Sequence, residues 1–155
     1  MSAFGTVRGE NGSPLRVHSR VVAVVRRDDD LLVTGGHDNS INEDYFRPIG
    51  GEVATGENAE LSLRRVIRSL LGSEISDIDL LGEIESTQTS FTEAVREVTF
   101  VYECTLDREQ LYSTTEIALK NTDRGATASW QPIALFAQDE ALLYPDGMLE
   151  LLEDE

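Results

Sequence analysis

The stretch that decides the fold is residues 47–72, RPIGGEVATGENAELSLRRVIRSLLG. A short strand pattern at its start runs into a glycine-containing loop at 50–57, which feeds the clearest helical pattern of the chain at 58–71. Gly72 follows as a C-terminal stop signal. In such a helix the apolar side chains form one continuous arc of about 140°, and the arginines lie on the opposite side. The arc contains Ala59, Leu63, Val66, Ile67, Leu70 and Leu71, and the arginines are Arg64, Arg65 and Arg68.

Further strand patterns lie on both sides of this helix in the sequence. Apolar and β-branched runs predict strands at 17–26, 31–34, 45–49, 80–85, 97–104 and 128–132. A helical turn is predicted at 107–112, a terminal amphipathic helix at 145–152, a hairpin turn at 28–30 and a loop at 35–40. Residues 1–15 lack periodicity and are expected to form a mobile arm, which leaves 16–155 as one mixed α/β domain.

The composition limits the possible functions. The 155 residues carry 13 basic and 29 acidic side chains, a net charge of −16, so binding of a nucleic-acid polymer is excluded by repulsion from its phosphates. No apolar run is long enough to span a membrane, and Cys104 is the only cysteine, which excludes an internal disulfide and a cysteine zinc site. These features predict a cytoplasmic protein. The acidity fits either a GC-rich genome or adaptation to high salt.

The loop and helix together resemble the Nudix box, G-x5-E-x7-R-E-U-x-E-E-x-G-U, where U is a bulky aliphatic residue. The matching positions are Gly51, Glu57, Arg65, Ile67 and Gly72. A late segment, Ser129-Trp130-Gln131-Pro132-Ile133, is similar to the end of a late strand in that family, and the resemblance extends over residues 17–152. The chain is therefore identified as resembling the Nudix hydrolase superfamily.

This resemblance implies a fold and a chemistry. The fold would be a Nudix-type α/β/α sandwich with a mixed central β-sheet, the box helix on one side and the terminal helix on the other. The implied chemistry is metal-dependent hydrolysis of a nucleoside diphosphate linked to another group, in which Mg²⁺ or Mn²⁺ neutralises the diphosphate and activates water. Family members are often dimers, so a homodimer is a possible assembly.

The chain departs from the family pattern at the metal-binding acids. The three helix glutamate positions hold Val66, Ser69 and Leu70, and a commonly acidic loop position holds Ala54. Val66 and Leu70 have joined the apolar arc, where a hard cation would find no oxygen ligand. No metal or other cofactor is therefore expected, and Glu57 is the one box acid that could serve as a ligand. Its alternative role is structural, at the start of the helix.

Four carboxylates are candidates for a relocated catalytic site: Glu52, Glu57, Glu85 and Glu97. The alternative is that they are ordinary surface acids of an acidic chain. Arg47, Gly50, Gly51 and Arg65 are the candidates for binding a ligand through guanidinium groups and loop amides. Arg47 could instead balance Glu43 or Asp44, and Arg65 could be a brace between loop and helix. His18 and His37 are isolated and are expected to be neither metal ligands nor bases.

Three functions remain open on this basis. The first is a domain weak or inactive as a hydrolase that binds a nucleotide-like or phosphorylated ligand, or a partner. The second is a pyrophosphohydrolase that uses relocated carboxylates with Mg²⁺ or Mn²⁺. The third is a structural interaction module without a small-molecule ligand.

Overall fold

The computed structural model describes residues 4–8, 14–89, 94–122 and 125–153. The strands are β1 (Phe4–Arg8), β2 (Pro14–Val24), β3 (Arg26–Arg27), β4 (Asp30–Asp38), β5 (Glu43–Glu52), β6 (Ile75–Thr89), β7 (Ala94–Leu106), β8 (Glu116–Ala118), β9 (Thr127–Pro132) and β10 (Leu142–Leu143). The helices are α1 (Ala59–Leu71), the 3-10 helix η1 (Glu109–Ser113), α2 (Ile133–Ala137) and α3 (Met148–Glu153). None of the described helices is long and apolar enough to cross a membrane.

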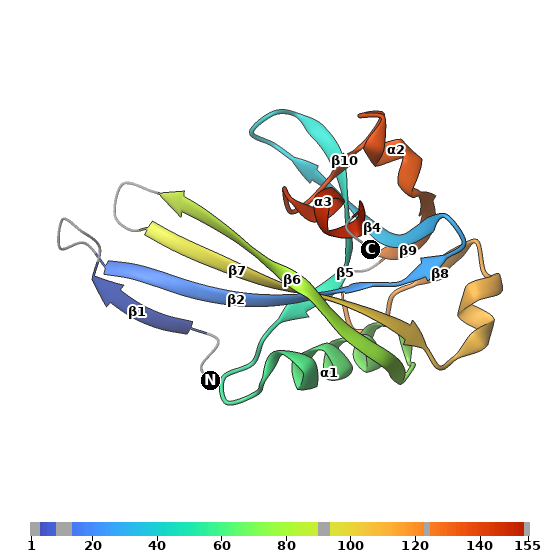
Figure 1. Ribbon diagram of the computed structural model, residues 1–155, viewed down its shortest axis with the longest axis horizontal. Helices are drawn as coiled ribbons and strands as arrows, with labels where there is room; N and C mark the ends of the chain where they lie inside the picture. Colours follow the sequence, from blue (N-terminus) through green and yellow to red (C-terminus); the bar gives the residue numbers. More distant parts are fainter. Residues whose placement is uncertain (1–3, 9–13, 90–93, 123–124, 154–155) are drawn as a thin grey trace.

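The strands form one mixed sheet whose main path runs β6-β7-β2-β5-β4-β9-β8 (Figure 1). β2 lies near its middle, parallel to β7 and antiparallel to β5. β10 adds a short parallel pairing to β5, in which Leu142 stands opposite Tyr45. Residues far apart in the chain therefore meet on β5.

Helix α1 forms where its capping signals predict it. The Asn58 side chain accepts a hydrogen bond from the Leu61 amide at 2.8 Å, which satisfies a free amide of the first turn. At the other end Gly72 adopts a left-handed conformation with φ 65°, a region that glycine enters without a steric penalty. The helix predicted over 58–71 is thus confirmed at Ala59–Leu71.

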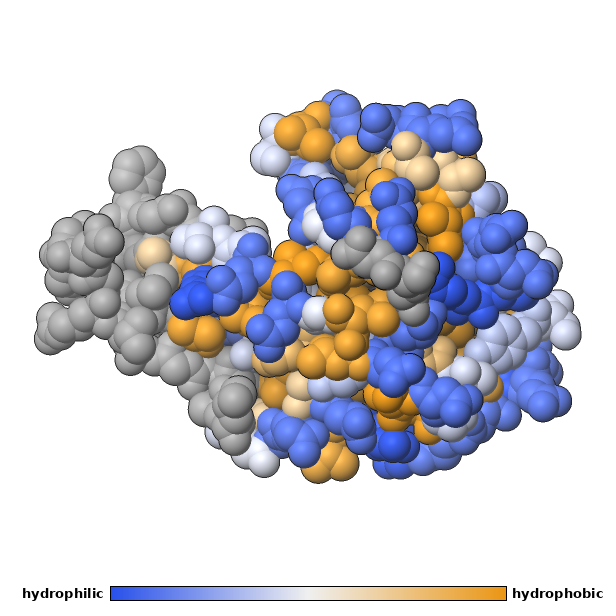
Figure 2. All heavy atoms as spheres, viewed as in Figure 1, coloured by the Kyte–Doolittle hydropathy of each residue, from blue (hydrophilic) through white to orange (hydrophobic). Residues whose placement is uncertain are grey.

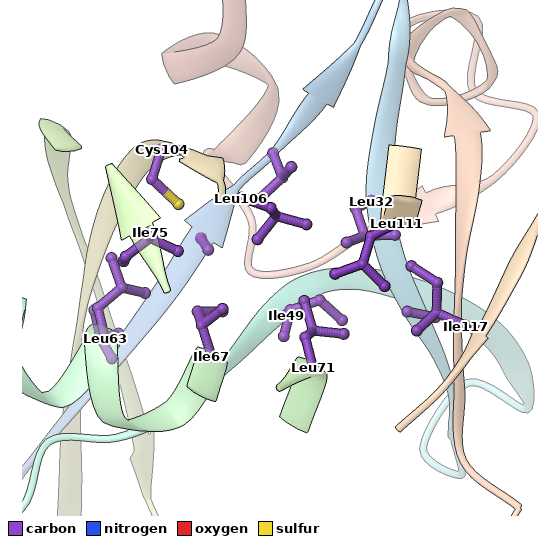
Figure 3. Packing of buried hydrophobic residues seen from close by; sticks show 14 of the residues in the cluster. Leu32, Ile49, Leu63, Ile67, Leu71, Ile75, Cys104, Leu106, Leu111 and Ile117 are labelled. Carbon is purple, nitrogen blue, oxygen red and sulfur yellow. The ribbon is translucent and has the colours of Figure 1, made fainter. Parts of the chain in front are cut away.

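Two hydrophobic cores lie on opposite faces of the sheet. One is under α1 and contains Ile49, Leu63 and Ile67 (Figure 3). The other lies against α2 and α3 and contains Phe136, Met148 and Leu152. Strand β2 contributes to both because successive side chains point to opposite faces: Val21 and Ala23 pack in the first core, Val22 and Val24 in the second. The predicted α/β/α sandwich is therefore confirmed.

Several strands are longer than predicted. β4 continues through residues 35–38, which were expected to be loop, because its ladder to β5 pairs Gly35 with Phe46 and Gly36 with Tyr45. A Cβ atom on Gly36 would stand 2.5 Å from Cζ of Tyr45, so the glycine makes room for the tyrosine ring. The short elements β8, β10 and α2 were not predicted.

The expected N-terminal arm also differs. Residues 4–8 form β1, which pairs antiparallel with β2, and β2 already begins at Pro14. The prediction of an arm without regular structure is therefore wrong for these residues. They are ordered by pairing between strands, which the local sequence does not reveal. Residues 1–3 and 9–13 of the expected arm lie outside the described residues.

Candidate functional site

The face of α1 that would carry the metal-binding acids borders a shallow hollow of about 440 Å³, called here the helix hollow. Its lining residues are Gly50, Gly51, Glu52, Ala54, Arg65, Val66, Ser69 and Leu70. Val66 is buried against Gly51, and Leu70 is half-buried. Val66, Ser69 and Leu70, which stand where the resemblance would place glutamates, thus present two aliphatic side chains and one hydroxyl, a donor set that does not fit Mg²⁺ or Mn²⁺.

Glu57 is held in a local brace. Its carboxylate accepts hydrogen bonds from Ser62 Oγ at 2.6 Å and from Arg65 Nε at 3.1 Å. Arg65 Nη2 also donates to the Glu52 carbonyl at 3.0 Å, which ties the glycine loop to the helix. The hydrogen bond from Ser62, followed by the contact with Arg65, lowers the pKa of Glu57. Glu57 and Arg65 therefore stabilise the loop through these contacts.

The other three candidate carboxylates have separate partners. Glu52 lies 3.0 Å from His18 Nε2, and Glu97 lies 3.4 Å from His18 Nδ1. Because these acids face opposite nitrogens of one ring, an ion on either nitrogen would be served by only one of them. Glu85 pairs with Arg96. Within the described ranges, no group of three or more His, Cys, Asp or Glu side chains is arranged to hold a metal ion.

A larger cleft of about 590 Å³, the arginine cleft, lies on the other face of the sheet. It is lined by Arg20, Val22, His37, Asp38, Asn39, Tyr45, Arg47, Ile84, Glu85, Ser86, Glu97, Thr99, Tyr144, Pro145 and Asp146. Val22 belongs to the core under α3, which places the cleft opposite the α1 face. The molecule is hollowed between the extended part of the sheet and the lobe that carries the β4–β5 hairpin (Figure 2).

Two arginines line this cleft without a direct ion pair, although the Glu97 and Glu52 carboxylates act on Arg20 through space. Arg20 on β2 is half-buried and Arg47 on β5 is exposed, and neither makes a hydrogen bond or ion pair with any described residue. Burial, and then the positive charge of Arg47, lower the pKa of Arg20. Other arginines have carboxylate partners: Arg26, Arg27, Arg64, Arg65, Arg68 and Arg96. Arg20 and Arg47 therefore form a site that can receive an anion.

An aromatic pair lies beside the arginines. The Tyr45 and Tyr144 rings stack with centroids 4.6 Å apart, and the Arg47 guanidinium lies 5.9 Å from the Tyr45 centroid. Tyr144 Oη donates to Asp38 Oδ2 at 2.8 Å. That hydrogen bond, with burial and the nearby acids, raises the pKa of Tyr144 to about 12. The phenol therefore stays neutral and fixes its ring through Asp38.

His37 also lines this cleft, at its rim. Its Nδ1 lies 2.8 Å from Asp44 and its Nε2 lies 3.2 Å from Asn42. The hydrogen bond to Asp44 is the largest cause of a raised His37 pKa. The ring is thus engaged within the β4–β5 hairpin, and Asp44, which sequence reasoning considered as a balance for Arg47, is within 4 Å of His37.

Apart from Glu57, which lines neither, the sequence-predicted residues divide between the two hollows. Arg47, Glu85 and Glu97 line the arginine cleft. Gly50, Gly51, Arg65 and Glu52 line the helix hollow. Arg20 and Tyr144 were missed. A charged residue inside the β-branched run 17–26 was the available signal for Arg20, while nothing near Tyr144 in the sequence points to β5.

Sequence comparison finds no matching family model and no matching curated protein. Solved structures match over most of the chain. A NUDIX hydrolase from Nitrosomonas europaea is 19% identical with a TM-score of 0.58, covering 88% of this chain and 86% of that one. A MutT NUDIX hydrolase from Burkholderia pseudomallei is 17% identical with a TM-score of 0.60, covering 88% and 96%. An ADP compounds hydrolase is 14% identical with a TM-score of 0.54, covering 97% and 83%.

Proposed function

We propose that this chain, which has the fold of the Nudix hydrolases, binds a phosphorylated, nucleotide-like small molecule in the arginine cleft and is weak or inactive as a hydrolase. The observation that carries the proposal is the pair Arg20 and Arg47, which face a cleft of about 590 Å³ without a hydrogen bond or ion pair to any described residue. Two guanidinium groups can share one phosphate through parallel hydrogen bonds.

The proposed loss of hydrolysis rests on the helix hollow. Val66, Ser69 and Leu70 offer no carboxylate, and Glu57 is engaged by Ser62 and Arg65. Without metal at the diphosphate, the reaction would lose several kcal/mol of transition-state stabilisation. No cofactor is part of the proposal, and the partner is a small molecule.

Relocated carboxylates remain the alternative for an active enzyme with Mg²⁺ or Mn²⁺. Glu52 and Glu97 are the nearest approach to such a site, because both contact His18. Their positions on opposite ring nitrogens, and the pairing of Glu85 with Arg96, argue against a shared ion. The third possibility, an interaction module or homodimer without a ligand, would leave Arg20 and Arg47 facing the cleft without a direct binding partner.

The proposal is tested by calorimetric titration of ADP-ribose and of inorganic pyrophosphate with EDTA present. We expect binding that Arg20→Gln and Arg47→Gln each weaken by about tenfold or more, the loss of one charge-assisted contact. Arg68→Gln is the matched control, because Arg68 pairs with Glu74 away from the cleft. Absence of binding of either ligand at millimolar concentration would remove the proposal and favour the interaction module.

The dependence of binding affinity on ionic strength is a second, independent test of the proposal. A net charge of −16 repels any anion, and salt screens that repulsion over a Debye length of about 8–10 Å. Moderate salt is therefore expected to strengthen binding relative to very low salt, before direct competition by chloride weakens it. Screening cannot explain a loss of binding that is specific to the Arg47→Gln variant, so the two effects are separable.

A further inference from the structure

The arginine cleft is electrically polarised along its length. At one end lies Arg20, on which Arg47 has the largest effect of the neighbouring charges, followed by Glu97 and Glu52. At the other end Tyr144 has Asp38, Asp146 and Glu43 as its charged neighbours. Tyr45 lies between the ends, because it stacks on Tyr144 and also lies below the Arg47 guanidinium. One end of the cleft therefore holds Arg20 and Arg47 with Glu97 beside them, and the other end holds further acids and the aromatic pair.

The acidic end contains a carboxylate that is free to act. Asp146 is exposed, lines the cleft and makes no hydrogen bond or ion pair with the described part of the chain. Asp38, in contrast, is already bonded to Tyr144 and Ser40. A carboxylate beside an aromatic ring is the environment in which proteins hold an ammonium group, by charge attraction and cation–π contact. Tyr144 and Asp146 lie two residues apart in the chain and both line the cleft, so together they can supply both elements.

The overall charge favours a ligand that carries both signs. The cleft lining holds four acids, Asp38, Glu85, Glu97 and Asp146, against Arg20 and Arg47. A purely anionic ligand gains at the arginines but is repelled by these acids and by the net charge of −16. A ligand with an additional cation converts part of that repulsion into attraction.

We propose, on the basis of the proposed anion site, that the cleft binds a zwitterionic phosphate ester: its phosphate lies on Arg20 and Arg47, and its protonated amine lies between the Tyr144 ring and Asp146. The class is thus narrower than phosphorylated molecules in general. Asp146 and Tyr144 would distinguish a zwitterionic phosphate ester from a purely anionic phosphate, whereas Arg20 and Arg47 would bind the phosphate of either ligand.

The test compares aminoalkyl phosphates of two to four carbons with the alkyl phosphates of the same length. The two series differ only in the terminal ammonium group. At neutral pH and low salt we expect the best aminoalkyl phosphate to bind about fivefold tighter than its alkyl partner, the scale of a cation–π contact combined with an exposed ion pair. Asp146→Asn should abolish this ratio while leaving alkyl phosphate binding unchanged or slightly tighter.

Asp79→Asn is the matched control, because it removes one negative charge from exposed β6 sequence outside the cleft lining. It should leave the ratio intact. Equal affinity of the two series, with Arg47→Gln still weakening both, would overturn the zwitterion proposal and leave the anion site standing. Binding of pyrophosphate but of neither series would have the same meaning. Absence of binding by every phosphate probe would overturn both proposals.

Discussion

Gly51 on β5 lies directly against Val66 on α1, so closely that a Cβ atom on Gly51 would stand 2.9 Å from Val66 Cγ2. The contact joins the two residues that the resemblance places at the first glycine of the box and at one of its glutamate positions. Because the two backbones approach here, the Val66 side chain is enclosed between helix and sheet. Val66 is therefore part of the packing that fixes the helix against the sheet.

Gly51→Ala is predicted to destabilise the fold by about 1–3 kcal/mol, the usual cost of overpacking a rigid contact. Val66 is β-branched and buried, so it cannot yield by a simple rotation. Urea denaturation measures the change. Gly35→Ala is the control on a neighbouring strand, because a Cβ there meets only ordinary contacts at 3.9–4.0 Å. Equal stability of the two variants would contradict the close packing at Gly51.

Restoring single box acids is predicted to have unequal effects. Val66→Glu should cost about 2–4 kcal/mol, because it buries a carboxylate without a partner. Leu70→Glu should cost clearly less, because Leu70 is half-buried on the wall of the helix hollow and can turn a carboxylate toward water. Thermal melts of the two variants, with and without Mg²⁺, measure the loss of stability that each substitution causes. A larger loss for Leu70→Glu than for Val66→Glu would reverse the structural assignment of these positions.

Hydrolysis of ADP-ribose or nucleoside triphosphates with Mg²⁺ is predicted to stay below about 1 per second, the lower part of the usual enzyme range. The reason is that Glu57, already bonded to Ser62 and Arg65, is the one acid present of the four that the resembled pattern would supply. Product analysis by chromatography measures the rate, with Glu57→Gln and Glu97→Gln alongside. A faster turnover that Glu97→Gln abolished would establish the relocated-carboxylate alternative.

The Glu57 brace predicts a pH-dependent contribution to stability. Its folded-state pKa is lowered, first by Ser62 and then by Arg65, from an ordinary value of 4.5. The contribution is therefore complete above about pH 4.5 and is lost as the pH falls through the folded-state pKa. Melting temperatures of the wild type and Glu57→Gln should differ at pH 7 and converge in acid. A difference between the two proteins that did not change with pH would contradict the ionic role of Glu57.

Tyr144 provides a spectroscopic check on the cleft. Its pKa of about 12 arises first from its hydrogen bond to Asp38, whose negative charge opposes phenolate formation. Asp38→Asn removes that charge, so the pKa of Tyr144 should fall toward the ordinary value of about 10. Absorbance titration of each protein, with Tyr144→Phe versions subtracted, isolates this one tyrosine. An unchanged pKa of Tyr144 in Asp38→Asn would contradict the hydrogen bond between the two side chains in solution.

The parts of the fold that were predictable depend on local signals. Helix α1 was placed within one residue, because Asn58 and Gly72 act on their own neighbours. The extra length of β4 and the existence of β1 depend on pairing with distant strands, and Gly35 and Gly36 give a local signal for a loop. A backbone ladder can include glycines when the partner strand supplies the hydrogen bonds.

The candidate site was only partly predictable for the same reason. Arg47 stood out because it precedes the glycine loop, and the absence of acids at Val66, Ser69 and Leu70 stood out only against the family pattern that the loop and helix resemble. Arg20 and Tyr144 lie far from Arg47 in the sequence and reach it only through the pairings of β2 and β10 with β5. Their meeting is a property of sheet topology that neither residue's neighbours encode.

Strand β2 has a consequence for how this domain can be altered. Its alternating residues Val21 and Val22 are committed to different cores, and the same strand carries Arg20 into the cleft. The layer formed by α1 and the layer formed by α2 and α3 are therefore not expected to separate into independently folding fragments, since removing either would expose one face of β2. A substitution that unpacks one face is therefore expected to lower the stability of the other face as well, and the domain is expected to unfold as one unit.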